Sequence, residues 1–193
     1  MLRSRAIASI AALAMAALVQ AAGLAIGDRI EPFALKDANG TRVDLAAAKG
    51  VQARVVIFMA TRCPVSNAYN GRMAALASDY AARGVAFFGV NANHQEPAAE
   101  VAEHARTHGF SFPVLKDDDN VQADRFGAQF TPEAYVFDAD WTLRYHGRID
   151  DSRDESAVTQ HDLRGALDAV LAGGAVPTPE TKAFGCTIKR VVK

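Results

Sequence analysis

Two continuous apolar runs divide the first half of the chain. Residues 54–60 and 85–90 contain almost no polar side chains, which predicts two strands buried on both faces of a sheet. The segment between them has apolar residues at helical intervals, which predicts a helix from Pro64 to about Arg83-Gly84. The residues on its apolar face are Val65, Tyr69, Met73, Leu76 and Tyr80. A strand, helix and strand of these lengths predict a right-handed parallel crossover.

The remaining patterns predict a hairpin, more strands and further helices. Two extended pieces, 33–36 and 41–45, flank an Asn-Gly turn and predict an N-terminal hairpin. Helices are expected over 97–108, 117–126 and 163–171, with a short strand or edge segment at 112–115 and an antiparallel pair at 134–137 and 142–147. Thr159 and Asp162 have the spacing of a capping box before the last helix.

The first residues have a different composition. A short basic start is followed by an apolar stretch over 6–19 and by small residues at Val19-Gln20-Ala21, which predicts a secretory signal peptide over residues 1–21, cleaved after Ala21. About 14 apolar residues are too few to span a bilayer, so no stable membrane insertion is expected after cleavage. We therefore expect a periplasmic or secreted protein with one domain over 22–174 and an extended tail over 175–193 that carries Cys186.

Charge excludes one class of partner. The 193-residue chain has a formal net charge of −1, and loss of Arg3 and Arg5 with the signal peptide makes it −3. Basic residues gather only in the short Lys189-Arg190 and Lys193 tail, so no nucleic-acid partner is expected. Export would place the two cysteines, Cys63 and Cys186, where disulfides form, as either one bridge or a redox pair.

Cys63 is the strongest candidate for chemistry. It lies between the first buried strand and the helix, and Pro64 suits the first helical position, so Cys63 is the predicted N-cap. A thiolate there would accept hydrogen bonds from the Val65 and Ser66 amides. Cysteines in such positions have pKa values lowered to about 3.5–7.5. The sequence thus predicts a reactive thiol, with a buried structural cysteine as the alternative.

Several stretches carry a family resemblance. Residues 58–66, Phe-Met-Ala-Thr-Arg-Cys-Pro-Val-Ser, resemble the active-site region of exported redoxins of the alkyl hydroperoxide reductase and thiol-specific antioxidant superfamily, a peroxiredoxin-like group. Residues 27–43 are similar to that family's opening hairpin, 130–133 to its cis-proline segment, and 147–150 to the strand end that follows. The resemblance covers 27–173. It implies an α/β thioredoxin-like fold, with a central mixed β-sheet flanked by helices and an N-terminal β-hairpin.

The chain departs from two motifs of its relatives. Ser66 stands where thioredoxins carry the second cysteine of Cys-x-x-Cys, and its hydroxyl would donate to the thiolate. Ala60 and Val56 stand where peroxiredoxins carry the threonine and proline of Pro-x-x-x-Thr-x-x-Cys. The resemblance also implies a cis-proline at Pro132, presenting the Thr131 backbone to an extended substrate. Arg62 would hold the thiolate by charge, unless it is a solvated surface residue.

These residues favour a thiol–disulfide oxidoreductase with Cys63 as nucleophile and Cys186 as provisional resolving cysteine. Arg62, Ser66, Thr131 and Pro132 would bind substrate, and the partner would be a protein or small-molecule thiol or disulfide. A peroxiredoxin-like thiol peroxidase acting on peroxide, and a non-catalytic binding domain with a structural Cys63–Cys186 bridge, remain open, as does pairing of Cys186 between molecules. No cofactor or metal is expected, since the His104/His108 pair lacks a third ligand.

Overall fold

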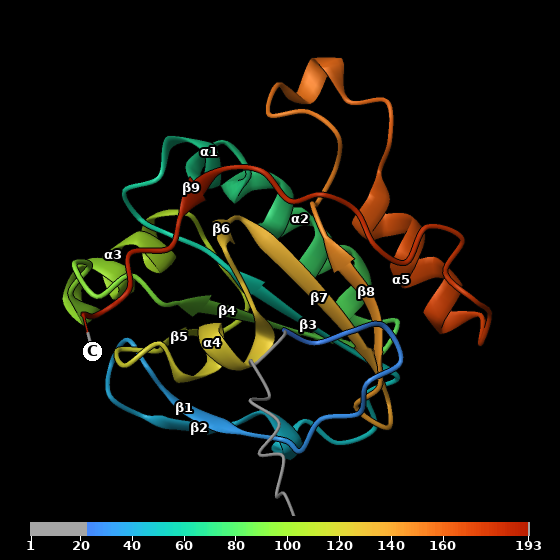
Figure 1. Cartoon of the computed structure of the whole chain (residues 1–193), viewed down its shortest axis with the longest axis horizontal. Coiled ribbons are helices and arrows are strands. Elements are labelled where there is room, and N and C mark those ends of the chain that lie inside the picture. Colours follow the sequence, from blue (N-terminus) through green and yellow to red (C-terminus); the bar gives the residue numbers. More distant parts are fainter. Residues whose placement is uncertain (1–22, 193) are drawn as a thin grey trace, which may run out of the picture.

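The computed structural model describes residues 23–192, so the predicted signal peptide lies outside the described residues. Within this range, a seven-stranded mixed sheet has the order β2-β1-β5-β4-β3-β7-β8 (Figure 1). Its strands are β1 Ala34–Asp37, β2 Arg42–Asp44, β3 Ala53–Phe58, β4 Val85–Asn91, β5 Val114–Lys116, β7 Glu133–Asp138 and β8 Leu143–Gly147. The predicted hairpin, the buried strands and the antiparallel β7–β8 pair are all confirmed.

Strand β3 forms the centre of the sheet. It pairs in parallel with β4, as the predicted crossover requires, and antiparallel with β7. All six of its residues are buried, which explains why its sequence shows no alternation. Of the two alternatives for residues 112–115, the short strand is confirmed and the edge segment is not, because β5 lies inside the sheet between β4 and β1.

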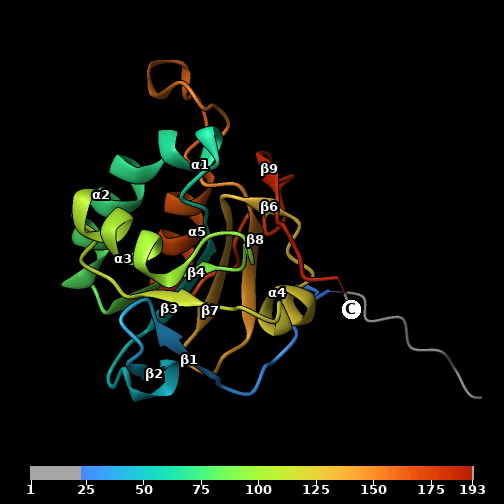
Figure 2. The ribbon, with the colours of Figure 1, turned by 90° about the vertical axis from the view of Figure 1, so that its left-hand side faces the viewer.

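Helices cover both faces of the sheet. The helices are α1 Pro64–Ala68, α2 Asn70–Ala81, α3 Ala98–Thr107, α4 Val121–Phe126 and α5 Asp162–Leu171, with 3-10 turns at Leu45–Ala47 and Glu155–Ala157. Figure 2 shows α2, α3 and α5 on one side of the sheet and α4 on the other. Alternate residues of β3 serve the two sides: Val55 and Ile57 join the core under α2, whereas Val56 and Phe58 join the core under α4.

Two local predictions are corrected. The single helix expected after Cys63 is divided at Tyr69, where α1 ends and α2 begins. The Tyr69 hydroxyl is held in the interior by donating to the Asp150 carboxylate at 2.9 Å. The capping box before α5 is wrong, because the Asp151 carboxylate accepts hydrogen bonds from the Thr159 hydroxyl and amide and draws Thr159 away from the helix start.

The tail folds back across the Cys63 end of the sheet. There β9, Cys186–Thr187, pairs antiparallel with β6, Phe130–Thr131, in a separate two-stranded sheet (Figure 1). Before β9, the His146 amide donates to the Pro179 carbonyl at 3.0 Å. After it, the Ile188 amide donates to the Gln129 carbonyl at 3.0 Å, and the Ile188 side chain is buried.

None of the helices within residues 23–192 combines the length and the apolar character needed to cross a lipid bilayer.

Phe126 provides a test of the core under α4. Its ring is 1% exposed and makes edge-on contacts with Phe33, Phe58, Tyr135 and Phe137. We expect Phe126→Ala to lower the free energy of unfolding by about 3–5 kcal/mol, measured by urea denaturation, because it leaves a cavity among aromatic rings. Val121→Ala, at a 57% exposed position of the same helix, is the control and should change stability little. Equal effects of the two substitutions would contradict this packing.

Candidate active site around the Cys63–Cys186 bridge

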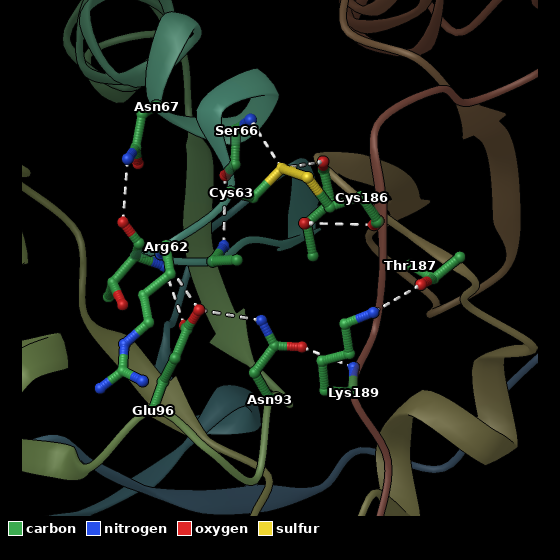
Figure 3. Close-up of a disulfide and its surroundings, with 12 residues drawn as sticks. Arg62, Cys63, Ser66, Asn67, Asn93, Glu96, Cys186, Thr187 and Lys189 are labelled. Atoms are coloured by element: carbon green, nitrogen blue, oxygen red, sulfur yellow. Dashed lines mark hydrogen bonds between the residues drawn. A yellow bond between two sulfur atoms is a disulfide. The ribbon is translucent and has the colours of Figure 1, made fainter.

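The two cysteines are joined within the chain. Cys63, in the loop after β3, and Cys186, in β9, form a disulfide with Cα atoms 5.9 Å apart across 123 positions of sequence (Figure 3). That separation lies within the usual range for disulfides. The fold therefore brings together the two residues that the sequence singled out as candidate catalytic residues.

Cys63 is the N-cap of α1, as predicted. Its backbone is extended, Pro64 is the first helical residue, and the Ser66 amide donates to Cys63 Sγ at 3.3 Å. The Val65 and Ser66 amides were both expected to reach the sulfur, and the hydrogen bond comes from Ser66. A main-chain N–H aimed at this sulfur favours its anionic form once the bridge is opened.

The Ser66 side chain has a different contact from the one expected. Its hydroxyl oxygen accepts a hydrogen bond from the Ala60 amide at 3.2 Å, and the residue is fully buried. Ser66 therefore ties the loop after β3 to the first turn of α1, while its backbone amide contacts the sulfur. A cysteine at this position would lack a good acceptor for the Ala60 amide.

The Arg62 side chain turns away from the bridge (Figure 3). Its Nε donates to Glu100 Oε1 at 2.9 Å, and more than half of the side chain is exposed. Hydrogen bonds from Arg62 and Thr61 lower the pKa of Glu100 to about 2. The Arg62 guanidinium, which was expected to hold the Cys63 thiolate, thus pairs with the Glu100 carboxylate instead. Only the Arg62 backbone remains close to the site.

Thr131 and Pro132 line the site from the opposite side. The Thr131–Pro132 bond is cis, as the resemblance implied. The Thr131 backbone pairs with Cys186, and its carbonyl oxygen lies 3.3 Å from Cys63 Sγ. The strand position expected to receive an extended substrate is therefore occupied by the protein's own tail.

Sequence reasoning missed a buried glutamate behind the loop that carries Cys63. Glu96 is 3% exposed and accepts hydrogen bonds from the Thr61 amide at 2.8 Å and the Arg62 amide at 3.1 Å. The Asn91 and Asn93 side-chain amides also donate to it. Burial alone would raise the pKa of Glu96, but these donors more than offset it, so the pKa lies below its usual range. The signal was available as a polar cluster that directly follows the buried strand β4.

A second buried glutamate holds the opposite wall. Glu133 directly follows the cis-proline and accepts hydrogen bonds from the Gln129 and Phe130 amides at 2.7 and 2.8 Å. Its Oε1 lies 2.6 Å from His146 Nε2. Burial raises the pKa of Glu133, and the contacts with His146 and the two amides bring it below its usual range. The strand that carries Thr131 is thereby fixed in place.

An open cavity of about 240 Å³ reaches the bridge. Both cysteines line it, together with Asn93, Glu96 and Lys189. Cys63 is 3% exposed, whereas Cys186 is only partly buried. The cavity thus meets the bridge from one side, next to the tail, where Cys186 is the more exposed of the two cysteines.

The histidine pair noted in the sequence lies elsewhere. His104 lies on α3 and His108 is the residue that follows this helix, with ring centroids 4.4 Å apart, and Asn70 Nδ2 lies 3.1 Å from His104 Nε2. Within residues 23–192, no three His, Cys, Asp or Glu side chains are grouped so that they could hold a metal ion.

Comparison with known proteins finds one family match and several similar structures. The model of the AhpC/TSA family matches residues 26–146. The structure is similar to that of a hypothetical protein from Sinorhizobium meliloti, with 35% identity, a TM-score of 0.82, and 89% of this chain and 98% of that chain covered. An uncharacterized conserved protein from Geobacillus kaustophilus has 33% identity and a TM-score of 0.81, with 88% and 94% covered.

More distant structures share the fold alone. One is that of a putative thiol:disulfide interchange protein DsbE from Chlorobium tepidum, with 20% identity and a TM-score of 0.61, covering 77% of this chain and 99% of that chain. No curated protein matches the sequence.

Gly185 provides a test of how the tail is placed. Its φ is +150°, and a Cβ there would collide with the Thr131 carbonyl. We expect Gly185→Ala to displace β9, to reduce the fraction of bridged protein seen by thiol labelling, and to destabilise the fold by about 1–3 kcal/mol. The matched control is Gly165→Ala, in the middle of α5 at a position where a Cβ would meet no neighbouring atom. It should raise the free energy of unfolding by about 0.5–1 kcal/mol. Full bridging and unchanged stability in Gly185→Ala would refute this placement.

Glu96→Gln tests the support of the loop that carries Cys63. We expect the free energy of unfolding at neutral pH to fall by about 1–3 kcal/mol, because an amide cannot accept from all four donors. Since the pKa of Glu96 in the folded protein lies below its unfolded value, its contribution is present above the unfolded pKa and is lost as the pH falls through the folded pKa. The stability difference between the two proteins should therefore shrink in acid. Glu103→Gln, on the exposed face of α3, is the control and should show little effect at either pH.

Proposed function

Because the chain belongs to the AhpC/TSA family, we propose that this redoxin is a thiol–disulfide oxidoreductase whose redox pair is Cys63 and Cys186. One observation carries the proposal: the N-cap sulfur is bonded to a tail sulfur at the wall of an open cavity. A purely structural bridge needs neither an amide aimed at one sulfur nor access from solvent.

The exchange runs in two steps from the reduced protein. The Cys63 thiolate, stabilised by the Ser66 amide, attacks one sulfur of a substrate disulfide and expels the other as a thiolate. The Cys186 thiolate then attacks Cys63 Sγ, which forms the bridge and releases the second substrate thiolate. With Cα atoms 5.9 Å apart, the second step needs no rearrangement of the fold. Cys186 thus takes the resolving role that Ser66 cannot perform.

Thiols and disulfides are the proposed partners, and the predicted signal peptide over 1–21 extends the proposal to an exported protein. The peroxidase alternative receives no support from residue 60, because alanine supplies no hydroxyl and its amide is bonded to Ser66. Peroxide consumption with dithiothreitol, lost in Cys63→Ser, would favour that alternative.

Redox titration tests the proposal against a static bridge. We expect the bridge to open reversibly in thiol buffers, with a reduction potential above about −300 mV, since structural disulfides lie below that value. After reduction, alkylation of Cys63 by iodoacetamide should have a midpoint pH below the roughly 8.5 of a free thiol.

Cys186→Ser serves as the companion variant in the same experiment. It should retain rapid alkylation at Cys63 and should accumulate a mixed disulfide with substrate, because the resolving thiol is missing. A bridge that resists reduction in the folded protein, or a Cys63 midpoint near that of a free thiol, would reject the redox role.

A further inference from the structure

We propose that the reductant of the oxidised protein is a small thiol rather than an extended polypeptide, and that it attacks Cys186 Sγ with Cys63 as the leaving group. The inference rests on the proposed function, since it assumes that the bridge is opened and closed in use. It assigns the two sulfurs to different half-reactions: Cys63 meets the substrate disulfide, and Cys186 meets the reductant.

The polypeptide route is closed by the tail. An extended chain would bind by pairing with the backbone of β6, but Thr131 already pairs with Cys186 and Phe130 with Thr187. Gly185 packs so closely on the Thr131 carbonyl that no second strand fits between them. A polypeptide thiol can reach the bridge in this manner only if β9 is displaced.

The tail is held on both sides of Cys186 by contacts that do not involve the disulfide. On one side, the Thr181 amide donates to the His146 carbonyl at 3.0 Å. On the other, the Lys189 amide donates to Asn93 Oδ1 at 2.7 Å, and the Arg190 side chain pairs with Asp124 at 2.8 Å. Ile188 adds a buried apolar side chain. Opening the bridge therefore leaves β9 in place and the polypeptide route closed.

The cavity of about 240 Å³ remains as the way in. It has room for a small thiol, and the tail residues Cys186 and Lys189 form one of its walls. Of the two sulfur-bearing residues, Cys186 is partly exposed, whereas Cys63 is 3% exposed. Access thus favours attack on Cys186.

The leaving group favours the same direction. Thiol–disulfide exchange is faster when the departing thiolate is the more stable one. Cys63 Sγ accepts a hydrogen bond from the Ser66 amide at 3.3 Å, and this hydrogen bond strengthens when the sulfur becomes an anion. When the disulfide breaks with Cys63 as the leaving group, the negative charge therefore forms on the sulfur that already accepts the Ser66 amide.

The electrons balance over two steps. The thiolate of a first small molecule forms a disulfide with Cys186 Sγ. The Cys63–Cys186 bond breaks at the same time, and the electron pair of that bond goes to Cys63 Sγ. A second thiolate attacks the small-molecule sulfur of the mixed disulfide, which yields the small disulfide and the Cys186 thiolate. Two thiols thus lose two electrons and two protons, and the two cysteines gain them.

Trapping the mixed disulfide tests which sulfur is attacked. The oxidised full chain is mixed with excess glutathione, quenched with N-ethylmaleimide at short times, and mapped by mass spectrometry. We expect glutathione on Cys186 and maleimide on Cys63, in about tenfold or greater excess over the reverse pattern. The reverse pattern, or equal amounts, overturns the inference but leaves the proposed function intact. A folded protein that neither glutathione nor dithiothreitol can reduce overturns both.

Comparing thiols of different size tests whether the docked tail excludes a polypeptide reductant. The second reductant is a ten-residue peptide with one central cysteine, and both rates are corrected for thiol pKa. We expect glutathione to reduce the wild-type bridge at least about tenfold faster than the peptide, because docked β9 excludes the peptide. Ile188→Ala should loosen the tail and narrow this ratio, whereas Val192→Ala, at a fully exposed position, should leave it unchanged. Equal rates for the two thiols on the wild-type protein would overturn the inference.

Discussion

Antiparallel pairing of Thr131 with Cys186 is the contact on which the rest of the site depends. It brings a sulfur from the tail to a sulfur that lies 123 positions earlier in the chain. The same pairing fills the strand position next to the cis-proline, so one set of backbone hydrogen bonds both supplies the second cysteine and covers the first. The tail thus contributes one half of the disulfide and at the same time restricts what can reach it.

Two buried carboxylates hold the walls between which this pairing takes place. Glu96 fixes the Thr61 and Arg62 amides on the Cys63 side, and Glu133 fixes the Gln129 and Phe130 amides on the Thr131 side. Burying a charged group is unfavourable unless several donors compensate it, and each glutamate has them. The geometry of the bridge is therefore set by two loops whose backbone amides are fixed by the buried carboxylates of Glu96 and Glu133.

One departure from the family motifs, Ser66 in place of a second cysteine, has a structural explanation. Ser66 replaces the usual second cysteine and uses its hydroxyl to accept the Ala60 amide. The sulfur that is bonded to Cys63 comes from the tail instead, through Cys186.

The amino-acid sequence determined the features that depend on neighbouring residues. The unbroken apolar run of β3 predicted a buried central strand, and Pro64 after Cys63 predicted the N-cap, because burial pattern and helix capping are local properties. Resemblance to a family then indicated the fold and the cis-proline. Tertiary structure alone decided the partners of Cys63, Arg62 and Thr131, since these are a tail strand and a carboxylate from distant parts of the chain. Hydrogen bonds between such segments leave no periodic trace in the sequence, and so the bridge could be suspected but not placed.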